Sequence, residues 1–179
     1  MINRMRIFIR KERSLILVSL LLCSGLIEIF PVMPPSNRSE SGILQTGQET
    51  FLAYAEGCLD AMEATAREMS VQGVAVIAFI PGEKSLTWIS RMKVVGTLVS
   101  DNSNFLSVAY SKAGEMAATL RNSGSAGREP LHGEFGYEGG VIEKVSTGYI
   151  LAVFSGATGE QDTEIARAGL EEMMTAFNQ

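Results

Sequence analysis

The single histidine of the chain, His132, limits the catalytic chemistry that this sequence could support. A Ser-His-Asp site needs a histidine that an acid orients and that touches a nucleophile, and the sequence contains no Gly-x-Ser-x-Gly segment to supply that nucleophile. A zinc site needs three or four His, Cys or carboxylate ligands, and one histidine with one buried cysteine cannot supply the usual set. His132 with Glu134 could hold a metal ion weakly; the alternative is a solvated histidine in a loop.

Lys112 and Arg91 are the basic residues that could contact an anionic ligand. Lys112 falls at the edge of the inward face of a predicted helix, where it could reach such a ligand or pair with Glu115 or Asp162. Arg91 and Lys93 end a predicted strand and would form a positive spot able to meet a carboxylate. A structural salt bridge for Lys112 and ordinary surface charge for Arg91 are the alternatives.

The segment SGATGEQDTEIARAG, which begins at Ser155, joins a glycine-containing turn to the start of a helix. Thr158 and Gln161 have the spacing of a capping box. Three acids fall in the first turn of this helix: Glu160, Asp162 and Glu164. The helix dipole favours them, and they would repel an anion from the helix start. If a ligand binds there, we expect Ser155 and Gly156 to contact it rather than the acids.

Apolar periodicity predicts the elements that must position these residues. Helices are expected over 46–72, where Thr46 and Glu49 have the spacing of a capping box, from a cap at 102 or 103 to about 122, and from 158 to 177. Strands are expected over 74–80, 85–92, 139–145 and 149–155. The strands come in pairs joined by tight turns, so we expect a largely antiparallel sheet with packed helices, an α+β fold in the order α-β-β-α-β-β-α. The β-α-β alternation of a nucleotide-binding Rossmann unit is missing.

The first 42 residues are expected to lie outside this domain. Basic residues precede the uncharged run 14–27, which is typical of a secretory leader and short of the roughly 20 apolar residues of a membrane span. Residues 1–30 are therefore read as a signal peptide, with an uncleaved membrane anchor and a misassigned start as alternatives. The Pro- and Ser-rich residues 31–42 are read as a linker, which leaves 43–179 as the domain.

The charge of the predicted domain excludes one class of partner. Residues 43–179 keep 9 basic and 17 acidic residues, a net charge of −8, so no basic surface for nucleic acid is expected. Contact with a membrane is expected only through the N-terminal segment. Cys58 is the one cysteine of this domain, so it forms no internal disulfide, and its position on an apolar helix face favours a buried thiol over a reactive one.

Four segments in order carry a resemblance to a known family: GVAVIAF, YSKAGEMAATLR, GGVI and SGATGEQDTEIARAG. On these motifs the predicted domain resembles the haem-degrading HbpS/GlcG-like family. The resemblance implies a profilin- or PAS-like fold that forms homo-oligomers, and some relatives bind or degrade haem or serve extracytoplasmic sensing. It makes His132 a candidate axial ligand of haem iron, and Gly139 and Gly140 further ligand-binding candidates.

This sequence also departs from the family pattern. Residues 46–72 contain no histidine, although haem-binding relatives place an axial histidine on this helix. Residues 80–83, Ile-Pro-Gly-Glu, replace the usual Asp and paired Gly, and no proline follows Gly139 and Gly140 in GGVIEK. The departures weigh against haem chemistry more than against the family itself.

Three hypotheses about function follow. The first is an exported domain, periplasmic or extracellular, that binds a small ligand, with haem or a related tetrapyrrole as the first candidate. The second is a non-enzymatic assembly or sensor-partner module without a cofactor. The third is an enzyme that acts on a small hydroxy acid, which relatives suggest and no residue here indicates.

Overall fold

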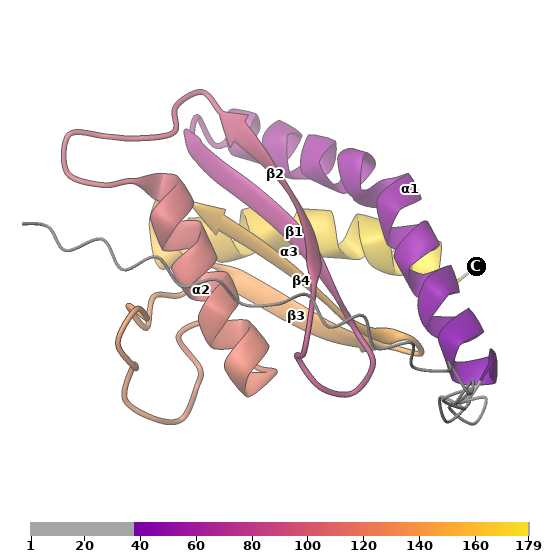
Figure 1. Cartoon of the computed structure of the whole chain (residues 1–179). Helices are drawn as coiled ribbons and strands as arrows, with labels where there is room; N and C mark the ends of the chain where they lie inside the picture. Colours follow the sequence, from indigo (N-terminus) through magenta and orange to yellow (C-terminus); the bar gives the residue numbers. More distant parts are fainter. Residues whose placement is uncertain (1–37, 179) are drawn as a thin grey trace, which may run out of the picture. The chain divides into compact units, whose positions relative to one another are not determined.

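The structure is a computed structural model that describes residues 38–178 (Figure 1). The elements are α1 (Arg38–Glu68), β1 (Gly73–Pro81), β2 (Ile89–Val95), α2 (Phe105–Thr119), β3 (Gly140–Val145), β4 (Gly148–Ser155) and α3 (Gly159–Phe177). This order confirms the α+β fold expected from the sequence. The predicted leader and most of the predicted linker lie outside the described residues, so these assignments stay predictions.

The four strands form one antiparallel sheet in the order β2-β1-β4-β3. The two hairpins therefore meet through β1 and β4, which are the central strands. Ile77 of β1 lies opposite Arg91 on one side and Ala152 of β4 on the other. Each hairpin contributes one central strand and one edge strand.

Helices cover both faces of this sheet (Figure 1). Alternate side chains of β1, such as Ile77, pack with α1 and α3, whereas their neighbours, such as Val76, pack with α2. Because successive side chains of a strand point to opposite faces, a strand covered on both faces needs apolar residues at every position. This explains why the segments of β1 and β4 are continuous apolar runs in the sequence.

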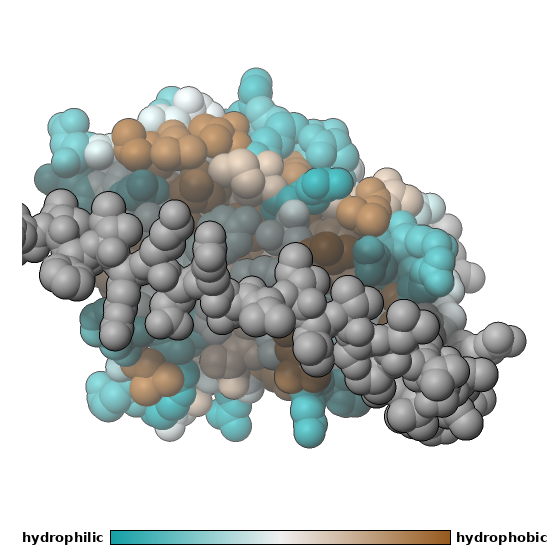
Figure 2. All heavy atoms as spheres, in the orientation of Figure 1, coloured by the Kyte–Doolittle hydropathy of each residue, from teal (hydrophilic) through white to brown (hydrophobic). Residues whose placement is uncertain are grey.

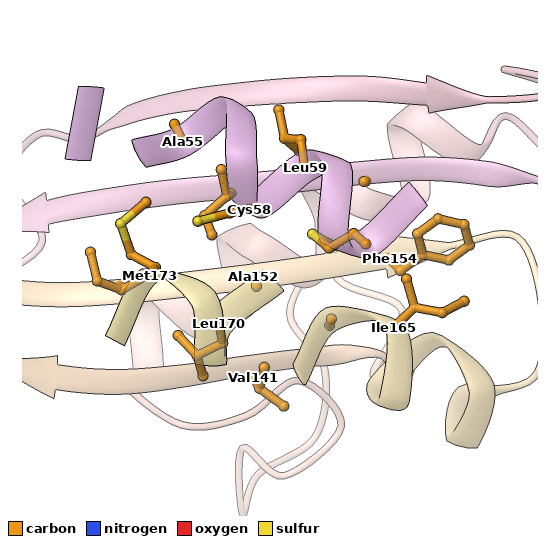
Figure 3. Close-up of a cluster of buried hydrophobic side chains, with 14 of the residues drawn as sticks. Ala55, Cys58, Leu59, Val141, Ala152, Phe154, Ile165, Leu170 and Met173 are labelled. Atoms are coloured by element: carbon orange, nitrogen blue, oxygen red, sulfur yellow. The ribbon is translucent and has the colours of Figure 1, made fainter. Parts of the chain in front are cut away.

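The larger core lies between α1, α3 and the sheet (Figure 3). Cys58 and Leu59 of α1 belong to this core together with Leu170 and Met173 of α3, and Cys58 lies on the side of α1 toward Met173. Cys58 is fully buried, and burial raises the pKa of its thiol to about 12, with the negative charge of Glu172 adding to the effect. The prediction of a buried thiol is confirmed, and a thiol with so high a pKa is unreactive at neutral pH.

The structure corrects the start of the first helix. Helix α1 begins at Arg38, within the predicted linker, so the capping box expected at Thr46 and Glu49 is wrong. Thr46 lies inside the helix, and its hydroxyl donates to the carbonyl oxygen of Gly42 at 2.9 Å. The polar residues before Thr46 gave no apolar periodicity, so the sequence showed only the part of the helix that packs on the sheet.

Two other boundaries also differ from the prediction. Strand β2 begins at Ile89 rather than at residue 85, and Leu86 is 87% exposed in the connecting loop. Helix α2 begins after Asn104, whose side chain accepts from the backbone N–H of Ser107, and it ends at Leu120, whose φ of 53° is left-handed. The prediction extended this helix to about residue 122, whereas the left-handed backbone of Leu120 makes it the C-cap residue.

The surface of the described residues carries apolar side chains in separate places. Figure 2 shows them among hydrophilic side chains on the visible face. The exposed large apolar residues are Leu52, Tyr54, Leu86, Val94, Val99, Leu131, Phe135 and Tyr137. Among residues 38–178, none of the helices is both long and apolar enough to span a membrane.

The close packing of α1 and α3 depends on Gly169. A Cβ atom there would lie 2.6 Å from the Sδ atom of Met62 and 3.1 Å from the carbonyl oxygen of Cys58. We expect Gly169→Ala to lower the free energy of unfolding by about 1–2 kcal/mol, because the overpacking outweighs the gain in helix propensity. Urea denaturation measures this difference.

The matched control is Gly57→Ala, on the exposed side of α1, where a Cβ atom would meet nothing within 4 Å. It is expected to stabilise the protein by about 0.5–1 kcal/mol. Equal effects of the two substitutions would contradict the close approach of the helices.

Candidate functional site

A buried ion pair joins the two helix layers at the end of β4. Nζ of Lys112, on α2, lies 2.7 Å from Oδ2 of Asp162, on α3, and also donates to the carbonyl oxygen of Phe154 at 2.9 Å. Both residues are only 3% exposed. The sequence placed Lys112 at the edge of a helix face and gave Asp162 as one partner; the structure confirms this partner and buries the lysine.

Asp162 also holds the turn that leads from β4 into α3. Its Oδ1 atom accepts from the backbone N–H of Ala157 at 2.9 Å. The capping box predicted at Thr158 and Gln161 is present, with the Thr158 hydroxyl accepting from the N–H of Gln161 at 3.3 Å. The N–H groups of Ala157 and Gln161 are therefore bonded to the chain's own oxygen atoms, and Asp162 stabilises the turn as well as complementing the helix dipole.

For each residue of this pair, burial and the charge of its partner shift the pKa in opposite directions. Burial lowers the pKa of Lys112, and the charge of Asp162 opposes that shift. Burial likewise raises the pKa of Asp162, and the charge of Lys112 together with the N–H of Ala157 opposes it. The lysine has its donors engaged by a carboxylate and a carbonyl, so this geometry does not present a free amine nucleophile.

Two glycines make room for the pair and its turn. Gly139, with φ of 121°, lies so close to Lys112 and Asp162 that a Cβ atom would collide with both. A Cβ atom at Gly156 would collide with the carbonyl oxygen of Gln72. These positions need glycine because a side chain would displace the backbone or the pair.

The ion pair lines a cavity of about 640 Å³, which we call the α2–α3 cavity. Its lining consists of Ser103, Phe105, Val108, Lys112, Gly136, Tyr137, Glu138, Ser155, Gly156, Ala157, Gly159 and Asp162. Three of the candidates predicted from sequence, Lys112, Ser155 and Gly156, thus come together here, and Gly139 lies against the pair.

The other candidates lie apart from this cavity. Gly140 lines a second cavity of about 640 Å³ beside α3. Arg91 is exposed on β2, and its neighbour Lys93 forms ion pairs with Asp60 and Glu63 of α1, so the expected positive spot is largely neutralised. His132 is exposed on the loop between α2 and β3.

The weak metal site considered for His132 and Glu134 has a competing interaction. The two terminal guanidinium nitrogens of Arg128, Nη1 and Nη2, donate to the Glu134 carboxylate at 2.7 and 2.8 Å, and the N–H of Leu131 adds a third bond. These bonds lower the pKa of Glu134 to about 2. Within residues 38–178, no group of three or more His, Cys, Asp or Glu side chains is arranged to hold a metal ion.

Sequence reasoning missed most of the cavity wall. Phe105 and Val108 precede Lys112 at helical spacing, so the three share one side of α2, a signal that was present in the sequence. Tyr137 and Glu138 lie in an irregular loop, where no periodicity shows which side chain turns toward the fold. They could be found only from the structure.

Comparisons with known proteins support the fold. No family model matches this chain, and no curated protein matches it. Among solved structures, the crystal structure of Klebsiella pneumoniae protein ORFY, a DUF336 protein, is similar with 17% identity and a TM-score of 0.52. The match covers 69% of this chain and 89% of that chain. The likeness in fold is consistent with the resemblance to GlcG-like proteins.

The contribution of the ion pair is measurable by a double-mutant cycle. Lys112→Met is expected to lower the free energy of unfolding by about 3–5 kcal/mol, because it leaves the Asp162 carboxylate buried without its counter-charge. Adding Asp162→Asn to that variant should recover about 1–3 kcal/mol, since the amide carries no charge and still accepts from Ala157. Chemical denaturation of the wild type, both single variants and the double variant completes the cycle.

Lys144→Met is the control, because it removes an ion pair with Glu83 whose side chains are both exposed. We expect little change in stability from it. A double variant less stable than Lys112→Met alone would show that charge pairing does not hold this site together.

Proposed function

We propose that this protein binds a small organic molecule and that the α2–α3 cavity is its binding site. The volume of about 640 Å³ lies within the range of roughly 300–1,000 Å³ typical of ligand sites. Its lining combines apolar side chains, Phe105 and Val108, with the polar groups of Glu138 and Ser155. Such a mixture provides contact area together with a few groups that orient a ligand.

The observation that carries this proposal is the position of the buried ion pair in the cavity wall. Lys112 and Asp162 fix α2 and α3 relative to the end of β4 before any ligand arrives. A wall held by buried charges costs little to organise on binding, because its side chains are already ordered. The cavity is thus supported by rigid elements on one side and by the loop of Tyr137 on the other.

Haem, the ligand implied by the sequence resemblance, does not fit the residues of this cavity. Its lining contains no His, Cys or Met to bind the iron, although Tyr137 has a hydroxyl. The lysine is paired with Asp162, so it is not free to meet a propionate, and Glu138 would repel one. We therefore propose a ligand other than haem.

The remaining expectations stay predictions. They include homo-oligomer formation, the role of an assembly or sensor-partner module, and an exported location. The hydroxy-acid enzyme has no additional support from the cavity, since its one lysine is engaged by Asp162.

Blocking the cavity tests the proposed site. A ligand-observed NMR screen of neutral, cationic and anionic fragments is expected to give binders at millimolar or lower Kd. Val108→Trp should weaken them by about tenfold or more, because the indole fills space beside Lys112. Val94→Trp, on exposed β2, is the control and should leave binding unchanged.

A screen without binders, or binders that both variants leave unaffected, would overturn the proposed site. Circular dichroism of both variants establishes that each retains the fold.

Haem is tested separately by titrating haemin into the protein and following the Soret band. Because the cavity lining offers no imidazole, thiolate or thioether, we expect no saturable change from the spectrum of free haemin. The same titration of His132→Ala is the control for the loop histidine. A saturable shift in the wild type that Val108→Trp abolishes would contradict our interpretation of the cavity.

A further inference from the structure

We propose that the α2–α3 cavity takes an organic cation, an amine with an aromatic or apolar body, and that Glu138 is the carboxylate that pairs with it. This inference rests on the proposed ligand-binding function. It is derived from the charges of the cavity, from the bonds already made by its polar groups, and from the aromatic residues beside Glu138.

The charges that line the cavity do not cancel. Lys112, Asp162 and Glu138 are its three charged residues, and the first two neutralise each other at 2.7 Å. Glu138 is left over, exposed, and within residues 38–178 it makes no ion pair. The cavity therefore has a net charge of −1 that a cationic ligand would compensate.

Two backbone donors of the turn into α3 that could serve an anion already have partners. At the start of α3, the N–H of Ala157 donates to Asp162, and the N–H of Gln161 donates to Thr158. A helix N-terminus binds an anion through such free N–H groups. Here the carboxylate of Asp162 accepts from Ala157, so an anionic ligand at this turn would lie beside a carboxylate.

The second cavity strengthens the negative field around Glu138. Glu138 lines it as well, together with Glu160, Glu164 and the single cation Arg167. The position of Glu138 between the two cavities places further acids behind it. Like-charged groups on one side of a carboxylate favour a cation on the other side.

Aromatic side chains next to Glu138 complete an amine site. Tyr137 lines the cavity and stacks on Phe135 with ring centroids 5.4 Å apart, and both rings are more than half exposed. Phe105 and Val108 of α2 supply apolar surface from the other wall. A cation is attracted to the face of an aromatic ring as well as to a carboxylate, and both groups lie here on consecutive residues.

Three compounds with the same phenyl body separate charge from shape: 2-phenylethylamine, 2-phenylethanol and phenylacetate. We expect the amine to bind the full-length protein at least about tenfold more tightly than the carboxylate, with the alcohol between them. Kd values come from ligand-observed NMR titrations at low salt, and raising the salt concentration should reduce the preference.

Glu138→Gln should abolish the preference for the amine, because the side chain keeps its shape and loses its charge. Glu143→Gln, an exposed carboxylate of β3 that lines neither cavity, is the matched control and should keep the preference. Thermal unfolding of both variants establishes that the fold is intact.

The outcomes distinguish this inference from the proposed function. Equal or tighter binding of phenylacetate, or a preference that survives Glu138→Gln, would overturn the amine assignment while ligand binding stands. If none of the three compounds binds, the amine assignment also fails, and the broader fragment screen with Val108→Trp decides separately whether the cavity binds ligands at all.

Discussion

The ion pair between Lys112 and Asp162 is the interaction on which the rest of the site depends. It connects α2 and α3, which cover opposite faces of the sheet, at the point where β4 ends. Because both side chains are almost fully buried, each charge needs its partner, and removing one leaves a buried charge at a cost of several kcal/mol. The two helices and the turn between β4 and α3 are therefore positioned together.

The pair also explains residue choices that look unrelated in the sequence. Phe154 offers its carbonyl oxygen to the lysine, and Ala157 offers its N–H to the aspartate. Gly139 is needed because a Cβ atom would occupy the space of the two charged side chains. Apolar side chains could fill the same volume. Hydrogen-bonded charged groups also fix the orientation of the two side chains and the distance between them.

Apolar periodicity predicted the fold because the core is built from regular helices and strands. It failed where the chain forms an irregular loop. Central strands covered on both faces gave continuous apolar runs, and Thr158 with Gln161 gave a cap that forms. The same capping pattern at Thr46 does not form, since the preceding residues continue the helix. Lys112 and Asp162 were recognisable as partners, whereas Tyr137 and Glu138 belong to a loop that tertiary contacts alone position.

The start of α3 shows why a sequence that resembles an anion-binding turn need not bind an anion. The small residues from Ser155 to Gly159 leave backbone N–H groups at a helix start, as an anion site requires. Asp162 lies one turn further along and turns back onto Ala157, so the chain supplies its own anion. Lys112 then neutralises that anion from the opposite layer. With both charges satisfied internally, the ligand preference of the cavity falls to Glu138 and Tyr137. These residues lie on the loop between α2 and β3, and neither one belongs to the buried pair.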